Sequence, residues 1–455
     1  MKSIKIENLR CFREAELNLQ YPGRELEREL KLPNINLLLG DNGAGKTTVL
    51  RAIALASLFH IMPQSGFVPY YLVRREKPQN EQPDSALIRA EVLLNEQDLE
   101  SRSLGKSQSK IGIGGKIGIG VVRHGDSEIL MRFDPAAPSS DDWLWDPMFV
   151  DNSPAFLVVG YGASRRVEDS GRFDESARRK SRLLRYERVA GLFESYITLT
   201  PLESWLPNFK KENPGRHKQV VNLIDRLLLE GASFAGDLEK GEYLFEMGGA
   251  KIPFGALSDG YRAYIGWIAD LLYHICRGAP SGAKLVETRG IVLVDEIDLH
   301  LHPEWQRSVI PTISEALPNL QFVLTTHSPI VAGSLYHENI FVMETDKDGS
   351  SRVRQYEEKI YGRSAEEILL SSYFDLKTTR AEPFVDELRD LSVKAGKGDL
   401  KAALAFMEKL AGQPEDATDE DAVKGKVKSS GNGRRKASAK SGGKARGKPS
   451  KSRKR

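Results

Sequence analysis

The chain has 455 residues, of which 40% are apolar and 28% charged, and it carries a formal net charge of +3. The length exceeds what one hydrophobic core usually holds, so we expect a main domain with insertions or a second lobe, large enough for an enzyme. Two cysteines, Cys11 and Cys276, argue against a disulfide framework or a cysteine-rich metal site. No apolar run approaches the roughly 20 residues of a membrane span, so we expect a cytoplasmic protein without a membrane partner.

Strand and helix patterns alternate along most of the chain. The N-terminus MKSIKIENLR alternates apolar and polar residues, which is typical of a first strand and not of a signal peptide. Uniformly apolar strands separated by helical patterns predict a parallel sheet covered on both faces, and a Gly-rich pair predicts an antiparallel hairpin. The expected strands are residues 3–9, 34–40, 88–94, 110–122, 128–133, 155–162, 242–247, 289–296, 320–327 and 339–345; the expected helices include 47–60, 303–313, 381–396 and 398–412.

We divide the chain into five parts. Residues 1–175 and 241–375 are expected to form the main domain, and residues 176–240 an inserted helical lobe, because that stretch is rich in Arg, Lys and Leu at helical spacing. C-terminal helices follow at 376–412. The remaining residues, 413–455, form an acidic and then basic tail that we expect to be disordered, because charge blocks with Gly, Ser and Pro bury no core.

The net charge conceals a strong asymmetry. Residues 424–455 contain 14 Lys or Arg and no acid, which leaves a net charge of −11 on the rest of the chain. Such a tail is either a solubilising extension or a nonspecific tether for DNA or RNA. A second basic stretch, residues 164–188, is either a solvated helical face or a set of phosphate contacts; its candidate residues are Arg165, Arg166, Arg178 and Arg179.

The segment GDNGAGKT matches the phosphate-loop pattern and follows an apolar strand and precedes a helix, the context that the motif requires. Its glycines allow backbone N–H groups to surround phosphates, Lys46 reaches the outer phosphates, and Thr47 is a ligand for Mg²⁺. We therefore expect ATP and Mg²⁺ as cofactors. The predicted nucleotide-binding residues are Gly40, Asp41, Asn42, Gly43, Ala44, Gly45, Lys46, Thr47 and Thr48.

A second motif, LVDEIDLHLHP, ends another apolar strand. Asp295 is placed to hold Mg²⁺, and Glu296 to orient or activate the attacking water. A zinc site at His300 and His302 is the alternative, but both histidines fall in a loop between strand and helix, which suits a surface facing a partner subunit better.

Two further segments define the class of phosphate-loop protein. ALSDGYRAYIG opens a helix with Ser258, Asp259 and Gly260, and LTTHSP places His327 after a strand. Alone, the first is an ordinary helix cap and the second a lone histidine. The order GDNGAGKT, LSDG, LVDE, TTH resembles that of ABC-type ATPases. The resemblance implies an α/β fold, a signature at Ser258 to Gly260 that reaches nucleotide on the other protomer, and Lys46, Glu296 and His327 as catalytic residues.

Within that class the chain is similar to the compact RecF-like and SMC-like AAA-family ATPases of bacterial anti-phage systems. These include Septu-type and retron-associated ATPases and the ATPase half of OLD-family nucleases. The similarity rests on IKIENLRCF, GYGASRR, DEIDLHLHPEWQ, TTHSPIVAGSL and YGRSAEEIL. His302 stands where many ABC ATPases have the D-loop aspartate. No Q-loop glutamine is recognisable, and GYGASRR, residues 160–166, is the substitute candidate.

The resemblance implies an ATPase switch that dimerises around ATP, acts with nucleic acid, and controls an effector in anti-phage defence or DNA maintenance. The chain has no recognisable nuclease motif, so the effector is expected to be a separate protein, a nuclease in the simplest case. Two alternatives remain: the motor subunit of an ABC transporter, and a nucleotide-dependent structural dimer with little turnover.

Overall fold

A computed structural model describes residues 1–24, 31–77, 80–94, 98, 113–132, 147–150, 153–167, 183–228, 231–279 and 282–411. The chain divides into two compact units, Met1–Thr379 and Arg380–Arg455. The predicted tail, 413–455, lies outside the described residues. Within those residues, no helix combines the length and apolarity needed to cross a membrane.

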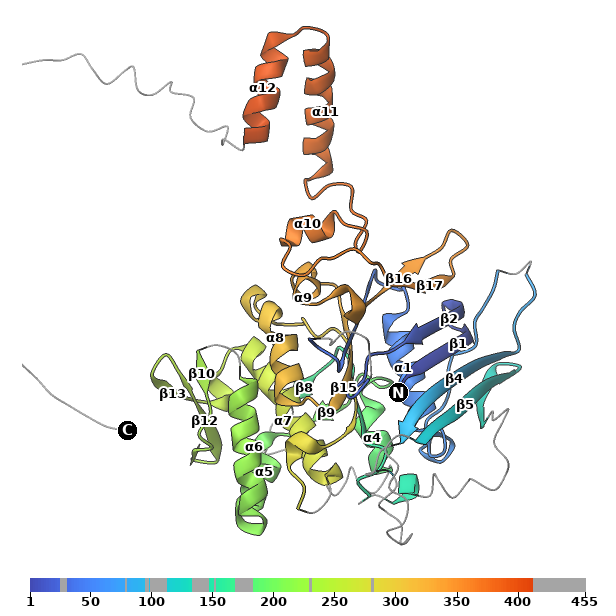
Figure 1. Ribbon diagram of the computed structural model, residues 1–455, viewed down its shortest axis with the longest axis vertical. Helices are drawn as coiled ribbons and strands as arrows, with labels where there is room; N and C mark the ends of the chain where they lie inside the picture. The colour runs from blue at the N-terminus through green and yellow to red at the C-terminus, as the bar shows by residue number, and fades with distance from the viewer. Residues whose placement is uncertain are drawn as a thin grey trace, which may run out of the picture. The chain divides into compact units, whose positions relative to one another are not determined.

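One large sheet runs through the first unit (Figure 1). Its strands are β1 (Ser3–Leu9), β2 (Phe12–Asn18), β3 (Ile35–Gly40), β4 (Ser85–Leu94), β5 (Ile113–His124), β6 (Ser127–Arg132), β7 (Val158–Tyr161), β14 (Gly290–Val294), β15 (Leu320–Thr326), β16 (Ile340–Thr345) and β17 (Ser351–Arg354). Their order across the sheet is β6-β5-β4-β1-β2-β17-β16-β3-β15-β14-β7.

The half of the sheet from β16 to β7 is parallel. Every residue of β15 is buried, which agrees with the uniformly apolar strands seen in the sequence. Because parallel strands share a direction, the loops after β3, β7, β14 and β15 meet at one edge of the sheet. All the predicted motifs except LSDG lie in or directly after these strands.

The strands from β6 to β2 form the antiparallel part of the sheet. The predicted Gly-rich hairpin is confirmed as β5 and β6, with His124 paired to Ser127. The pairing of Ser351 with Phe12 joins β17 to β2 and makes the two halves one sheet. The predicted α/β class, a sheet with a parallel part covered by helices and an antiparallel part, is confirmed.

Successive residues of the central strands point into two different cores. Leu37 and Leu39 of β3 belong to one cluster, whereas Leu38 belongs to the other. Helix α1 (Lys46–Ser57) packs in the cluster of Leu38, and α7 (Asp259–Gly278) in the cluster of Leu37. The sheet is therefore covered on both faces, as the apolar strands predict.

Shorter elements complete the fold. The other helices are α4 (Leu184–Ala190), α5 (Leu202–Glu212), α6 (Pro214–Leu227), α8 (Pro303–Ala316), α9 (Pro329–Gly333), α10 (Ala365–Leu369), α11 (Glu382–Gly396) and α12 (Leu400–Ala411), with 3-10 turns at Met62–Gln64, Phe254–Ala256, Leu285–Glu287 and His337–Asn339. Small strands are β8 (Arg166–Val167), β9 (Thr198–Leu199), β10 (Ala232–Ser233), β11 (Leu238–Glu239), β12 (Glu242–Met247) and β13 (Ala250–Pro253). Helices α4 to α6 lie in the predicted lobe, whose boundaries stay a prediction.

Candidate nucleotide site

The predicted phosphate loop connects β3 to α1. Its three glycines have positive φ values, +147° at Gly40, +84° at Gly43 and +102° at Gly45, which glycine adopts without the penalty other residues incur. A Cβ atom on Gly40 would lie 2.4 Å from the Met343 carbonyl oxygen, and one on Gly45 2.6 Å from the Cys11 Sγ. The loop therefore needs glycine both for its conformation and for its neighbours. Helix α1 begins at Lys46 without a side-chain cap, which leaves its first N–H groups for a ligand.

The Lys46 side chain folds back over this loop. Its Nζ donates hydrogen bonds to the Gly40 and Asp41 carbonyl oxygens, at 2.7 and 3.0 Å, and lies 2.8 Å from the His327 Nε2. Burial lowers the pKa of Lys46, and the Asp295 carboxylate partly opposes this. Among the described residues no carboxylate forms an ion pair with Nζ, because its contacts are two carbonyls and an imidazole. A buried cation of this kind fits an anionic ligand such as a phosphate.

Asp295 follows β14 and links the end of this strand to helix α1 and to strand β15. Its Oδ2 accepts a hydrogen bond of 2.7 Å from Thr47 Oγ1 on α1, and its Oδ1 accepts one of 2.6 Å from Thr325 Oγ1 on β15. The carboxylate is buried. The pair predicted to hold Mg²⁺, Thr47 and Asp295, is thus already in contact, and it offers the hard oxygen ligands that this ion prefers.

Glu296 adopts a φ of +50°, a left-handed conformation that costs a glutamate roughly 1 to 2 kcal/mol. Two hydrogen bonds hold it there. Its N–H donates to Thr325 Oγ1 at 2.7 Å, and its carbonyl accepts from the Arg165 guanidinium at 2.7 Å. Thr325 therefore contacts both acids, a role that sequence reasoning missed although the residue stands in the recognised segment LTTHSP.

The Arg165 side chain is largely enclosed by the protein and contacts the backbone of the two acids. One guanidinium nitrogen donates to the Asp295 carbonyl at 2.8 Å and another to the Glu296 carbonyl at 2.7 Å. Burial lowers the pKa of Arg165 to about 10, so the group stays protonated at neutral pH. We describe this fork as the Arg165 clamp. The predicted role of Arg165 in phosphate contact competes with it for the same donors.

The signature segment lies against the loop that follows β14. A Cβ atom on Gly260 would be 2.6 Å from the His300 carbonyl oxygen, and the Tyr261 and Trp305 rings meet edge to face at 4.1 Å between centroids. Ser258 is the N-cap of α7, yet its exposed hydroxyl forms no capping hydrogen bond. Asp259 is exposed and paired with Arg262. The signature therefore offers a free hydroxyl at a helix N-terminus.

The two histidines of the loop have different environments. His300 is exposed with a φ of +66°, whereas His302 caps α8 through Nδ1, which accepts from the Glu304 N–H at 3.4 Å. No cluster of three or more metal-binding side chains occurs in the described part of the chain. The position of the usual D-loop aspartate is thus occupied by a residue that begins a helix.

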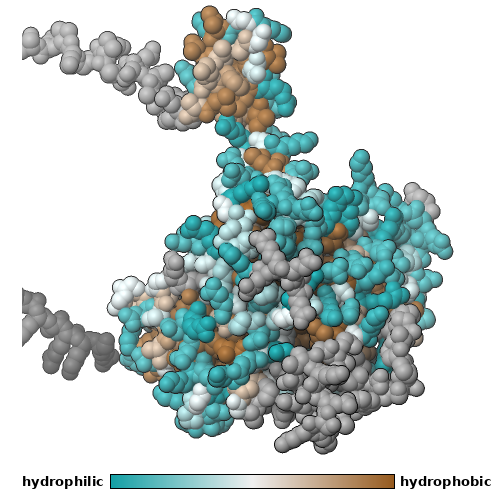
Figure 2. Space-filling model, viewed as in Figure 1, coloured by the Kyte–Doolittle hydropathy of each residue, from teal (hydrophilic) through white to brown (hydrophobic). Residues whose placement is uncertain are grey.

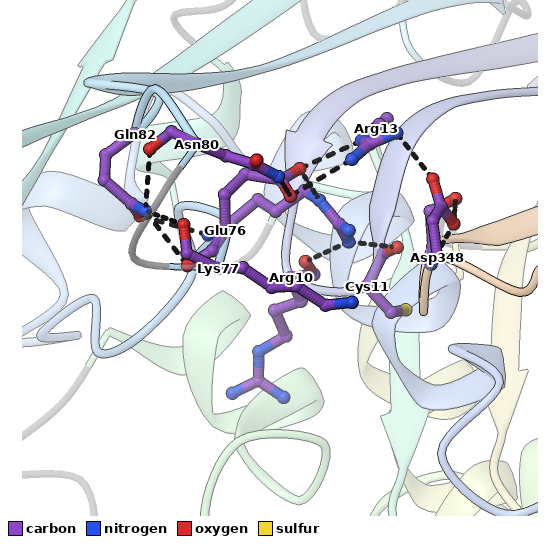
Figure 3. A network of polar contacts seen from close by, with 10 residues as sticks. Arg10, Cys11, Arg13, Glu76, Lys77, Asn80, Gln82 and Asp348 are labelled. Atoms are coloured by element: carbon purple, nitrogen blue, oxygen red, sulfur yellow. Dashed lines mark hydrogen bonds and ion pairs between the residues drawn. The ribbon is translucent and has the colours of Figure 1, made fainter.

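A polar network holds the turn between β1 and β2 beside the phosphate loop (Figure 3). Arg74 donates to the Cys11 carbonyl at 2.6 Å and to Glu76 at 2.6 Å, and Arg13 bridges Glu76 to Asp348 in the turn after β16. The Arg13 guanidinium, followed by that of Arg74, lowers the pKa of Glu76 to about 2. Because Cys11 packs against Gly45, this network supports the loop from behind.

The other predicted arginines lie elsewhere. Arg166 is exposed on β8. Arg178 and Arg179 lie outside the described residues. The structure thus brings together Lys46, Thr47, Asp295, Glu296 and His327 around one loop, with Arg165 supporting the acids.

Comparison with known proteins adds to this geometry. The family described as "AAA domain, putative AbiEii toxin, Type IV TA system" matches residues 35–332, well over half of the chain. The chain belongs to this family. A second description, "AAA ATPase domain", matches residues 1–62. The matched region of this AAA protein contains the phosphate loop, both acids and His327.

Curated relatives of this AAA protein include defence-system ATPases. It is 27% identical over 241 residues to the Septu protein PtuA of Bacillus mycoides, which covers 52% of this chain and 31% of that protein. It is 40% identical over 88 residues to the "Retron Ec83 probable ATPase" of Escherichia coli, covering 19% of this chain and 16% of that protein. The chain thus spans about a third or less of these relatives. The predicted resemblance to Septu-type and retron-associated ATPases is confirmed.

Solved structures with a similar arrangement include an SMC head bound to the C-winged helix domain of ScpA. The sequence identity is 15% and the TM-score 0.45, and the match covers 78% of this chain and 97% of that one. For the SMC head domain from Thermotoga maritima the sequence identity is 14% and the TM-score is 0.43.

The Arg165 clamp predicts that Arg165→Lys will fail to replace arginine. One ammonium group does not reproduce a planar fork on two carbonyls, so both Arg165→Lys and Arg165→Ala should reduce ATP turnover by at least about tenfold. Binding of ATP should change little in either variant. The measurements are kcat and the ATP dissociation constant, with exposed Arg166→Ala as the control. If lysine restores a binding affinity that alanine has lost, Arg165 contacts phosphate directly and the clamp is wrong.

Proposed function

We propose that this AAA protein binds and hydrolyses ATP and dimerises around it. The observation that carries the proposal is the convergence of Lys46, Thr47, Asp295 and Glu296 on one glycine-rich loop, with a buried lysine that forms no ion pair among the described residues. Lys46 would hold the outer phosphates, and Thr47 and Asp295 would hold Mg²⁺. The bound ion would supply neutralising charge for the phosphates.

The residues around the loop would have different roles in ATP hydrolysis. Glu296 would orient and deprotonate the attacking water, because its backbone is fixed at both N–H and carbonyl. The Nε2 atom of His327 contacts Lys46. When Lys46 turns toward the bound phosphates, this nitrogen would be released to donate a hydrogen bond to the terminal phosphate. Both roles need an ordered loop after β14 and β15.

A second protomer would complete the site. Gly260 packs on the His300 carbonyl of its own chain, so the signature segment is held by the loop before α8 and presents Ser258 outward. A hydroxyl beside the N–H groups of a 20-residue helix suits a phosphate carried by a partner. The exposed His300 would lie in the same dimer surface.

The relatives suggest the setting. Septu and retron-associated ATPases support a role in anti-phage defence, with nucleic acid and a separate effector, a nuclease in the simplest case, as partners. The +14 tail at 424–455 is the candidate contact for DNA or RNA.

Replacing Glu296 by glutamine should retain ATP but stop turnover. Loss of the base should slow hydrolysis by at least about 100-fold, or about 2.7 kcal/mol. The measurements are phosphate release and ATP binding with Mg²⁺. Glu304→Gln, an exposed acid in the first turn of α8, serves as the control and should behave like the wild type. Unchanged phosphate release in Glu296→Gln would remove Glu296 from the mechanism.

Two inactive variants should complement each other if the site is shared. Ser258→Arg keeps its phosphate loop and Lys46→Ala keeps its signature, so a mixed dimer contains one intact composite site. Part of the ATPase activity should return on mixing. Addition of the double variant, which has neither element, should restore none. A Glu296→Gln protein that stays monomeric with ATP would contradict the shared site.

Deleting residues 422–455 should weaken binding to DNA or RNA and flatten its salt dependence. The reason is that fewer condensed counterions are released from the phosphate backbone. Turnover of ATP without nucleic acid should stay near the wild-type value, because the tail carries none of the catalytic motifs. The control replaces the tail with Gly and Ser at equal length. Equal affinity and salt slope with and without the tail would refute the tether and leave a solubilising extension.

A further inference from the structure

The second unit contains a helical hairpin, α11 and α12, that has no closed core. The two helices pack along each other, and Lys409 forms an ion pair of 2.7 Å with Glu387. Yet among the described residues of both helices only Ala402 is buried. A stable two-helix unit of about 30 residues normally needs a further layer, because so short a chain hides too little apolar surface.

Helix α12 is apolar on two opposite sides. Ala402, which is 6% exposed, marks the side that faces α11. Leu400, Leu404 and Met407 are 80%, 61% and 66% exposed. At about 100° per residue these three side chains fall within roughly 60° of one another and about 140° to 160° from Ala402. We call Leu400, Leu404 and Met407 the outer stripe. Since it points away from α11, a third helix is needed to cover it.

The hairpin also separates its charges along its length. The tip, residues 391–402, contains Lys394, Lys397 and Lys401 with one acid, a net charge of +2. The base, residues 382–390 and 403–411, has five acids and two bases, a net charge of −3. Only the charges on α12 itself lie beside the outer stripe, and Lys401 and Glu408 flank it on the same side. Two copies of α12 placed antiparallel would bring each Lys401 beside the partner's Glu408.

The composition of the rest of the C-terminal chain is poor in apolar side chains. Residues 412–455 contain two large apolar side chains, Val423 and Val427, among many charged and small ones. The apolar side chains of the hairpin are visible on its surface in Figure 2. A stripe of this kind on a soluble protein marks an interaction site.

We propose that the α11–α12 hairpin pairs with the same hairpin of a second copy, antiparallel, through the outer stripe. The product is an isologous four-helix arrangement in which Leu404 lies near the two-fold axis and the charged ends match. This contact is distinct from the proposed dimer around ATP and does not require nucleotide. One chain therefore has two self-association surfaces.

The first test uses the full-length chain without nucleotide. Leu404→Asp should raise the dissociation constant of this dimer by at least about 100-fold, about 2.7 kcal/mol, because it buries an unpaired carboxylate. Leu404→Met keeps an apolar side chain of similar volume and should still dimerise. Sedimentation velocity over a range of protein concentrations gives the constants. Binding of ATP should be equal in all three proteins, which shows that the first unit is intact.

A second test guards against simple unfolding of the hairpin. Lys401→Glu and Glu408→Lys each reverse one of the two charges that flank the outer stripe, and both positions are exposed. Each variant should dimerise more weakly alone, because like charges then meet at both ends of the contact. A mixture of the two should form a heterodimer. Wild-type chains that stay monomeric without nucleotide, or reversed variants that dimerise as well alone as mixed, would overturn the proposal.

Discussion

The nucleotide site depends on one buried carboxylate. Asp295 binds α1 through Thr47 and β15 through Thr325, while its N–H donates to the Tyr161 carbonyl at 2.8 Å and its own carbonyl accepts from Arg165. Three segments that are distant in sequence, at Thr47, Thr325 and residues 161–165, are thus fixed to one residue. Because a buried carboxylate is costly unless hydrogen-bonded, the contacts with Thr47 and Thr325 stabilise its charge, while the backbone contacts fix its position. The strained backbone of Glu296 is tolerated because the same neighbours hold it.

The strand end at Tyr161 extends this arrangement to the signature helix. Tyr161 Oη donates to Asp270 Oδ2 on α7 at 2.8 Å, and Asp270 Oδ1 accepts from the Thr200 N–H at 2.7 Å. Burial opposes ionisation of Asp270, but His274, 3.3 Å away, lowers its pKa overall. The helix that begins at the signature is therefore tied, inside the protein, to the strand that holds Asp295. A ligand at Ser258 and the acids of the site share one rigid connection.

The sequence predicts the short motifs of this site, but few of the contacts between motifs that are distant in the chain. GDNGAGKT and LVDE are recognisable because glycine conformations and strand-end acids are set by neighbouring residues. The Arg165 clamp and the Thr325 bridge depend on side chains that meet only when β7, β14 and β15 pair, so no spacing reveals them. Strand β2 was missed because FREAELN buries only three of its seven residues and reads as a charged segment. Strand β17 was missed because four residues give too short an alternation.

The separation of the chain into two units gives the two self-contacts different physical controls. The proposed shared ATP site would be assembled from polar groups such as Lys46 and Ser258, so its strength would follow the charge of the ligand between protomers. The hairpin contact is built from apolar side chains with matching charged ends, so it persists without ligand and weakens modestly with salt. If the chain has both proposed contacts, one controlled by ATP and one independent of it, nucleotide would change the geometry of an assembly without dissolving it. Such an arrangement suits a switch that must stay assembled while it waits for its signal.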